Sequence, residues 1–212
     1  MVHVSNDLII KKLGLSDYTD TWQAMKDFTK YRTPETPDEL WILEHNPVFT
    51  LGTNAKSEHI LNAGDIPVIK IDRGGQVTYH GPGQLVIYLL LNLHRHKLGV
   101  RKLVSIIEDS IIKILSNYGV TALNDPKAPG VYVDGKKVAA LGLRVSRGYT
   151  THGLSLNVNM DLSPFERINP CGYENLEITQ CNTLGISNPL PQLADELVKV
   201  LQQKLSKSTP EH

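Results

Sequence analysis

The chain has 212 residues, of which 41% are hydrophobic and 21% charged, a composition typical of a soluble globular protein. Its 22 basic and 22 acidic residues give a formal net charge of zero, which argues against binding nucleic acid through bulk charge. No apolar run approaches the roughly 20 residues of a membrane span, and the N-terminus lacks a signal-peptide pattern, so we expect a cytoplasmic protein. We predict a single domain over residues 1–212, with a flexible tail at 204–212.

The first third of the chain is predicted to contain short strands around one helix. The helix, Asp17–Lys30, is amphipathic and carries Trp22, Met25 and Phe28 on one face. Strands are predicted at Leu8–Leu13, Glu39–Glu44, Val48–Leu51 and Ile66–Ile71, and loops at Arg32–Asp38, His45–Pro47 and Gly52–Asp65.

A glycine-rich segment, Arg73–Gln84, follows these strands. It lacks the Gly-Lys-Ser/Thr ending of a Walker loop and precedes a strand instead of a helix, so neither common phosphate-binding motif is predicted. Its glycines would let the backbone pass close to a bound ligand, whereas the structural alternative is a tight turn between two buried strands. Because Arg73 and His80 have no evident purpose in a plain turn, we favour a binding segment.

The second half of the chain is predicted to fold as strands and two long helices. The continuous apolar run Leu85–Leu93 indicates a strand buried on both faces. Alternation over Leu154–Met160 indicates a half-buried strand, and Asp134-Gly135 indicates a hairpin between Val131–Val133 and Val138–Val145. Helices are predicted at Val100–Tyr118, which ends at Gly119, and at Leu190–Leu205, whereas Thr179–Leu184 has no clear preference. The pattern predicts an α+β fold with a mixed or antiparallel sheet flanked by helices.

One cysteine lies in an unusual setting. Asp161–Phe165 predicts a short helical turn with Ser163 as its N-cap, and Asn169–Gly172 predicts a turn that presents Cys171 to a substrate. A buried, inert thiol is the alternative for Cys171, and we interpret Cys181 as structural. Two cysteines fit a reducing compartment better than a disulfide framework, although a bond between them stays open.

A pair of lysines and a histidine motif are the remaining candidates for chemistry. Lys136 and Lys137 lie in the predicted hairpin turn, where solvated side chains are the rule, but either ammonium would lower the pKa of a neighbouring Cys171 thiol. His94 and His96 would share one face of a strand, as metal ligands do, yet no third ligand has a recognisable spacing. We therefore predict solvated histidines at a strand end and no metal.

Three long motifs resemble one enzyme family in order and spacing. They are RGGQVTYHGPGQLVIY, KKVAALGLRVSRGYTTHGLSLNVNMDL and FERINPCGY, within a region from Trp41 to Thr183. The chain resembles the octanoyl-acyl carrier protein:protein N-octanoyltransferases, also called lipoyl(octanoyl) transferases or lipoate–protein ligase B. The resemblance implies a single α+β domain like that of biotin and lipoate protein ligases. It also implies a transferase that needs no cofactor and performs the first step of endogenous protein lipoylation and lipoate biosynthesis.

The resemblance also implies roles for particular residues. Cys171 corresponds to the nucleophile that forms an acyl-enzyme thioester, and Lys137 to the lysine of a Cys-Lys dyad that lowers its pKa; Lys136 is a second candidate. The implied substrate-binding residues are Arg73, Gly74, Gly75, Gln76, Val77, Thr78, Tyr79, His80, Ala140, Leu141, Gly142, Gly153, Leu154 and Ser155.

The implied partners are octanoyl-acyl carrier protein as donor and lipoyl domains as acceptors. The lipoyl domains are those of 2-oxo acid dehydrogenase complexes and of the glycine cleavage H protein, and a monomeric enzyme is expected. Because carrier protein is acidic, we expect a local basic patch drawn from Arg95, Lys97, Arg101, Lys102, Arg144 and Arg147. We expect Leu141, Leu143 and the Gly74–Gly83 segment to form the walls of an acyl tunnel of limited length.

Three other classes of function compete with this reading. An ATP-dependent lipoate or biotin ligase would activate a free acid and need no cysteine. A cysteine hydrolase would pair Cys171 with His80 or His152, and a non-catalytic binder would keep its function without Cys171. The Pro-Cys-Gly turn and the nearby lysine favour the transferase.

Overall fold

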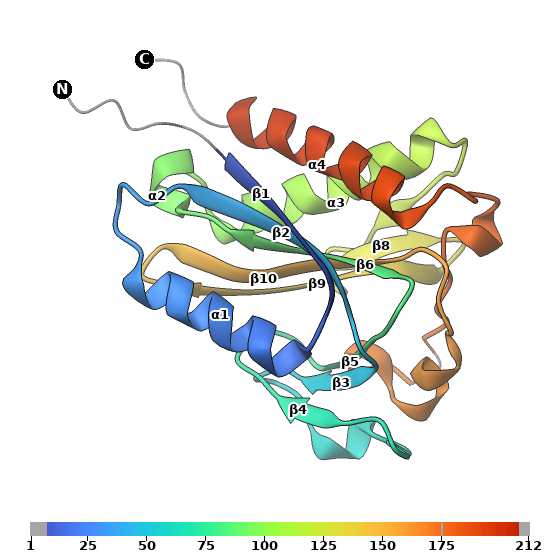
Figure 1. Cartoon of the computed structure of the whole chain (residues 1–212). Coiled ribbons are helices and arrows are strands. Elements are labelled where there is room, and N and C mark those ends of the chain that lie inside the picture. The colour runs from blue at the N-terminus through green and yellow to red at the C-terminus, as the bar shows by residue number, and fades with distance from the viewer. Residues whose placement is uncertain (1–7, 175, 208–212) are drawn as a thin grey trace.

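A seven-stranded sheet forms the centre of the molecule in the order β1-β2-β6-β10-β9-β8-β7 (Figure 1). The computed structural model describes residues 8–174 and 176–207, apart from the side chains of Cys171 and Lys207. The strands are β1 (Leu8–Ser16), β2 (Asp38–His45), β6 (Gln84–Leu90), β7 (Leu123–Asn124), β8 (Gly130–Val133), β9 (Lys136–Ser146) and β10 (Tyr149–Asn157). Only β1 and β2 pair in parallel among these strands, so the sheet is mixed, as predicted.

Helices cover both faces of this sheet. Helices α3 (Val100–Asn117) and α4 (Leu190–Lys207) lie on one face, and α1 (Tyr18–Tyr31) lies on the other (Figure 1). Strand β6 shows the consequence, because Leu85, Ile87 and Leu89 enter the core under α3 and α4. The alternate residues Val86, Tyr88 and Leu90 pack with Met25 of α1. The prediction of a strand buried on both faces is confirmed.

A second, smaller sheet was not predicted. It has the order β4-β3-β5, with β3 (Val48–Leu51), β4 (Val68–Lys70) and β5 (Val77–His80). Strand β5 lies inside the glycine-rich segment, where we predicted a ligand-binding segment and no strand. Val77 and Tyr79 pack with Phe49 and Phe165 in a separate apolar cluster, and this burial outweighs the turn composition around them.

Several predicted boundaries need correction. The apolar run ends as a strand at Leu90, and α2 (Leu93–His96) begins because the Asn92 side chain accepts hydrogen bonds from the amides of His94 and Arg95. His94 and His96 are therefore helical, and His96 is hydrogen-bonded to Asp38 at 2.8 Å instead of being solvated.

Strand β10 also differs from its prediction. It runs from Tyr149 to Asn157, earlier in the chain than predicted, and it is buried along both faces instead of half-buried. Leu154 and Leu156 enter the main core, while the buried Asn157 side chain donates to the carbonyl oxygen of Thr179 at 3.0 Å. Polar residues in this strand therefore do not mark a solvent-facing side.

The loops and the last helix contain further short elements. These are the 3₁₀ turns η1 (Ser57–His59), η2 (Ser163–Arg167), η3 (Pro170–Gly172) and η4 (Asn182–Leu184). Ser163 is the first residue of η2 and not its N-cap, because Asp161 accepts the Ser163 amide at 2.9 Å. Helix α4 continues to Lys207 with Leu205 buried, so the first part of the predicted tail is helical, and residues 208–212 lie outside the described residues.

The two hairpins that carry β9 have tight turns. Asp134 and Gly135 have φ values of 49° and 79°, which is a type I′ turn and confirms the predicted hairpin. Arg147 and Gly148, with φ values of 53° and 81°, form a second such turn between β9 and β10 that the sequence reading missed. These two turns place β9 between β8 and β10 in the sheet.

Candidate active site

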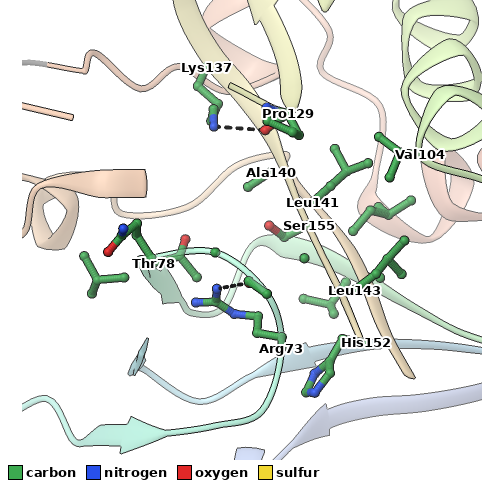
Figure 2. Close-up of a pocket in the computed structure, with 18 of the residues that line it drawn as sticks. Arg73, Thr78, Val104, Pro129, Lys137, Ala140, Leu141, Leu143, His152 and Ser155 are labelled. Atoms are coloured by element: carbon green, nitrogen blue, oxygen red, sulfur yellow. Dashed lines mark hydrogen bonds between the residues drawn. The ribbon is translucent and has the colours of Figure 1, made fainter. Parts of the chain in front are cut away.

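A cavity of about 350 Å³ is lined by three parts of the molecule (Figure 2). These are the paired strands β9 and β10 of the main sheet, the glycine-rich segment, and the start of α3. The predicted residues that line it are Arg73, Gly74, Gly75, Gln76, Val77, Thr78, His80, Lys137, Ala140, Leu141, Gly142, Leu143, Gly153, Leu154 and Ser155. Tyr79 is an exception, because its ring lies 5.5 Å from the rings of both Phe49 and Phe165 on the other side of β5. Three segments far apart in sequence thus meet at one cavity.

Lys137 lies in strand β9 and not in the hairpin turn where we predicted it. Its side chain is buried in the cavity wall, with the residue 3% exposed. The ammonium donates to the carbonyl oxygen of Pro129 at 3.2 Å and lies 5.1 Å from the centre of the Tyr132 ring. A Cβ atom at Gly130 would lie only 2.9 Å from Lys137 Cε, so glycine at that position makes room for the lysine.

Lys136 has the opposite environment. Its side chain is 50% exposed and forms an ion pair with Glu177 at 2.6 Å, outside the cavity. Because successive side chains of a strand point to opposite faces, adjacent lysines separate into one buried and one exposed cation. The geometry therefore places Lys137 in the cavity wall and Lys136 outside it.

The backbone of Cys171 forms the middle of η3, and its side chain lies outside the described part of the structure. The Gly172 amide donates to Asn169 O at 2.9 Å, and the segment beyond η3 returns to β9. There the Lys137 amide donates to Glu177 O at 2.8 Å, and the Thr179 amide donates to Lys137 O at 2.9 Å. Tyr173 lines the cavity together with Lys137, so the chain reaches the cavity wall two residues after Cys171.

The far end of the cavity is polar; His80 and His152 were candidates from sequence, whereas Tyr18, Tyr88 and the pairing of His152 with Asp72 were not predicted. His152 is buried with φ 61°, and its ring nitrogen Nε2 is 3.0 Å from Asp72 Oδ1, which also accepts the Trp22 indole N–H at 2.8 Å. The hydrogen bond from His152, opposed by burial, lowers the pKa of Asp72 to about 2. Burial lowers the pKa of His152, so the imidazole is held neutral.

Two further histidines near this end are also held neutral. His80 lines the cavity and bonds to Gln84 at 2.7 Å, and burial lowers its pKa to about 3. His45 bonds to the Tyr88 hydroxyl at 2.7 Å, and burial lowers its pKa to about 4. Tyr18 and Tyr88 also line the cavity, and no local sequence pattern marks them, because they come from α1 and the fully buried β6.

Cys181 has none of these features. It is a free thiol, fully buried in the main core, and burial raises its pKa to about 12. The interpretation of Cys181 as a structural residue is confirmed. Among residues 8–174 and 176–207, no three histidine, cysteine, aspartate or glutamate residues gather closely enough to hold a metal ion. Within the same part of the chain, no helix has the length and apolar character needed to cross a bilayer.

Comparisons with known proteins identify a family model and similar sequences. Residues 17–206 match the model of the lipoyl protein ligase A/B catalytic domain. An octanoyltransferase of Vibrio vulnificus strain YJ016 is 57% identical over 198 residues, covering 93% of this chain and 91% of that protein. An octanoyltransferase of Shewanella sp. strain ANA-3 is 58% identical, with the same coverage of 93% and 91%.

Solved structures show the same fold at low sequence identity. A bipartite lipoate protein ligase of Thermoplasma acidophilum aligns with a TM-score of 0.76 at 12% identity, covering 94% of this chain and 84% of that one. The biotin protein ligase of Aquifex aeolicus in complex with biotin and ATP aligns with a TM-score of 0.59 at 15% identity, covering 96% and 72%. These likenesses confirm the predicted ligase-like α+β fold.

Proposed function

The chain belongs to the lipoyl protein ligase A/B catalytic domain family, as an octanoyltransferase, and we propose that its cavity transfers an octanoyl group through a thioester on Cys171. The observation that carries the proposal is the 57% identity to proteins named octanoyltransferase over 93% of the chain. The cavity supports it, because a buried lysine and an apolar strand surface lie in one hollow.

The first step joins the octanoyl group to the enzyme. The Cys171 thiolate attacks the carbonyl carbon of octanoyl-acyl carrier protein, a new C–S bond forms, and the carrier thiolate leaves. One thioester replaces another, so the step is close to balanced in free energy and needs no ATP. A lysine ammonium beside the sulfur favours the thiolate, and Lys137 is the buried ammonium that lines this cavity.

The second step moves the octanoyl group to its acceptor. The amine of a lipoyl-domain lysine attacks the thioester carbonyl, the amide bond forms, and the Cys171 thiolate leaves again. The attacking amine must lose a proton. Lys137 first passes the proton that it took from Cys171 to the departing carrier thiolate, and the neutral amine of Lys137 then accepts the proton of the attacking amine. The amide is more stable than the thioester, so this step draws the reaction forward.

Backbone amides stabilise the oxyanion in both steps. Three amides near the cavity already donate within the protein: Gly74 to Leu143 O at 3.0 Å, Gly172 to Asn169 O at 2.9 Å and Tyr173 to Pro170 O at 3.1 Å. We therefore assign the oxyanion to the remaining amides of the glycine-rich segment and of the turn around Cys171.

We further propose the setting of this reaction. The donor is octanoyl-acyl carrier protein, and the acceptors are lipoyl domains of 2-oxo acid dehydrogenase complexes and of the glycine cleavage H protein. Residues 1–212 act as one catalytic domain, as a monomer in the cytoplasm, where the free thiol of Cys181 is in keeping with a reducing compartment. The substrate-binding residues are those predicted from sequence, with Tyr79 acting through the packing of β5.

The ATP-dependent ligase is the second candidate and has weaker support. Its supporting observation is the shared fold with lipoate and biotin ligases, at identities of only 12–15%. Fold alone does not determine chemistry, whereas identity above half the residues usually accompanies the same reaction. The proposal therefore predicts transfer from the carrier thioester without nucleotide.

The test is the intact mass of the enzyme after mixing with octanoyl-acyl carrier protein in the absence of ATP. Wild type should gain one octanoyl group that hydroxylamine removes, and Cys171→Ser should gain none. Cys181→Ser is the matched control and should acylate like wild type, because that thiol is buried in the core. Addition of a lipoyl domain should then discharge the acyl group onto the domain.

The other outcomes separate the rivals. Product without an adduct would mean direct transfer and would overturn the thioester step. Release of free octanoate without any acceptor would indicate a hydrolase. Attachment of free octanoate that occurs only with ATP would indicate the ligase.

A further inference from the structure

The side chain of Arg73 lines the cavity, and hydrogen bonds hold its guanidinium end. Its Nη2 atom donates to Thr50 O and to Thr50 Oγ1, each at 2.9 Å, and Nη1 donates to Gly74 O at 3.0 Å. The residue is 7% exposed, and Figure 2 shows it between Thr78 and His152. These bonds join the glycine-rich segment to β3 of the small sheet and hold the arginine in one position.

Glycines surround this side chain where it crosses β9. A Cβ atom at Gly142 would lie 2.8 Å from Arg73 Cδ, and one at Gly52 would lie 2.9 Å from Nη1. Gly142 lies in β9, so that strand has no side chain at the point where the arginine stem lies against it. The aliphatic stem of Arg73 therefore lies directly on the sheet and narrows the cavity over Gly142.

The distance from the Lys137 ammonium to the Arg73 stem over Gly142 follows from the pairing of β8 and β9. A Cβ atom at Gly130 would lie 3.2 Å from Lys137 Nζ, and Gly130 pairs with Ala140, so the ammonium lies near the level of Ala140. Gly142 is two residues further along β9, about 7 Å at 3.3 Å per residue. An extended eight-carbon acyl chain is roughly 9 Å long, from C–C bonds near 1.5 Å, so its terminal carbon reaches Gly142 when its carbonyl carbon lies about 2 Å before the level of the ammonium.

Beyond Arg73 the cavity changes character. Its lining there includes Tyr18, His80, Tyr88 and His152, and His152 Nδ1 is buried without a hydrogen-bond partner among the described residues. A methylene chain that reached this end would bury these polar groups against carbon, which costs free energy. The polar end and the arginine stem therefore both oppose a longer chain.

We propose that Arg73 sets the length of the acyl chain, because its stem stops the terminal carbon of an octanoyl group over Gly142. This inference rests on the proposed octanoyl transfer. Arg73 acts here as a specificity-determining residue whose hydrogen bonds to Thr50 and Gly74 keep the stop rigid. The guanidinium is committed to those bonds, and the chain meets the aliphatic part of the residue.

The test compares transfer rates from octanoyl-, decanoyl-, dodecanoyl- and palmitoyl-acyl carrier protein to a lipoyl domain. Wild type should prefer octanoyl, and Arg73→Ala should lower the octanoyl-to-dodecanoyl ratio of kcat/KM at least about tenfold, since displaced methylenes discriminate by this order. Arg73→Lys keeps an aliphatic stem over Gly142 and should keep the wild-type ratio, whatever its rate. An unchanged ratio in a folded Arg73→Ala variant would overturn the proposal.

A measurement on the wild type covers the case in which Arg73→Ala does not fold. In a crystal structure of the octanoyl-enzyme, the terminal carbon should lie in van der Waals contact with the Arg73 stem. A terminal carbon elsewhere, with Arg73 unmoved, would overturn the length limit while leaving octanoyl transfer intact. If wild type transferred palmitoyl as fast as octanoyl, this inference alone would be wrong; if it transferred neither, the proposed function would be wrong as well.

Discussion

Two neighbouring lysines show how strongly the environment of a side chain can differ between adjacent positions of a strand. Lys137 is buried in the cavity with its ammonium on Pro129 O, whereas Lys136 is exposed and paired with Glu177. Exposed ion pairs contribute little, with a median of about 0–1 kcal/mol, so Lys136 has little effect on stability. A buried ammonium next to a reacting group can instead determine the rate of proton transfer.

We therefore predict opposite outcomes for two matched substitutions. Lys137→Met should lower the rate of acyl-enzyme formation by about 10²–10⁴-fold, the usual contribution of a positioned acid or base, because the thiolate loses its cation. Lys136→Met should stay within about threefold of wild type, since an exposed pair is worth about 1 kcal/mol or less. Both rates are read from the intact mass of the enzyme after rapid mixing with octanoyl-acyl carrier protein.

The pH dependence of the rate of acyl-enzyme formation distinguishes a proton-transfer role of Lys137 from a structural one. If Lys137 only supported the fold, Lys137→Met would lower the melting temperature and leave the shape of the rate–pH profile unchanged. Equal losses in the two variants would mean that the resemblance, which assigns the lysine next to Val138, had misplaced the partner of Cys171.

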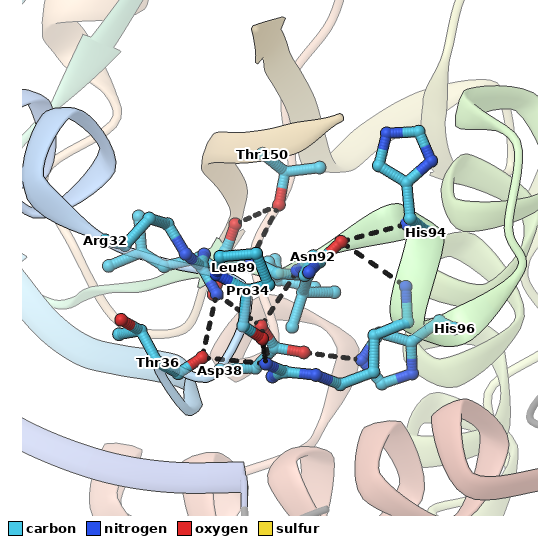
Figure 3. Close-up of polar contacts among 12 residues, drawn as sticks. Arg32, Pro34, Thr36, Asp38, Leu89, Asn92, His94, His96 and Thr150 are labelled. Carbon is cyan, nitrogen blue, oxygen red and sulfur yellow. Dashed lines mark hydrogen bonds and ion pairs between the residues drawn. The ribbon is translucent and has the colours of Figure 1, made fainter. Parts of the chain in front are cut away.

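At the scale of elements, a buried ionic cluster joins α1, β2 and α2 (Figure 3). Asp38, the first residue of β2, accepts Arg32 Nη2 at 2.6 Å, Arg95 Nη1 at 3.1 Å and His96 Nε2 at 2.8 Å. It also accepts the Asn92 amide at 2.8 Å. Burial alone would raise the pKa of Asp38, but hydrogen bonds from His96 and Arg32 outweigh it and keep that pKa below its usual value.

Removal of this carboxylate should destabilise the fold strongly. Asp38→Ala leaves the buried Arg32 guanidinium without its carboxylate, and broken buried pairs cost about 3–5 kcal/mol. The matched control is Asp195→Ala, which removes the exposed pair of Lys12 and Asp195 between β1 and α4 and should cost about 1 kcal/mol or less. Urea unfolding at pH 7 measures both, and equal costs would mean that the cluster is solvated in solution.

The same cluster shows what the sequence could and could not predict. Strong periodicity identified α1, α3, α4 and β6, because each has a face or a run that only burial explains. Helix α2 was missed because its four residues are too few to show a period, although Asn92 is a local N-cap, and strand β5 was missed because it depends on its distant partner Phe49. Residues that act through such partners carry no local pattern.

The candidate site was also predicted only in part, because some of its residues lie in contiguous motifs and others come from separate elements. Motif residues such as Arg73, Lys137 and Ser155 were identified from three contiguous segments that all reach the cavity. Tyr18, Tyr88 and the Asp72 partner of His152 come from separate elements that only the folded sheet brings together. The close approach of Gly142 to Arg73 likewise depends on how the small sheet packs against β9.

At the scale of the whole molecule, the formal net charge is zero, but some basic residues are paired with carboxylates and others are exposed without a described ion pair. Two members of the expected basic patch are already paired with carboxylates of the protein: the largely buried Arg95 with Asp38, and the exposed Arg144 with Asp72 at 3.2 Å. Lys97, Arg101 and Lys102 are exposed at the start of α3, next to Val100, which lines the cavity. A smaller patch than the sequence suggested is therefore available to an acidic carrier protein.

This patch should steer the carrier protein toward the cavity. Reversal of two charges in Arg101→Glu/Lys102→Glu should lower the association rate about tenfold or more at low salt, because complementary charge mainly accelerates encounter. The association rates of this variant and of the wild type should converge above about 0.5 M salt, where the Debye length falls to a few ångströms. The control Lys113→Glu/Lys199→Glu makes the same net change at exposed sites that do not line the cavity, on α3 and α4, and should slow association much less. Stopped-flow measurements give the association rate of each variant at several salt concentrations. Equal slowing of both variants would mean that net charge, and not this patch, determines the association rate.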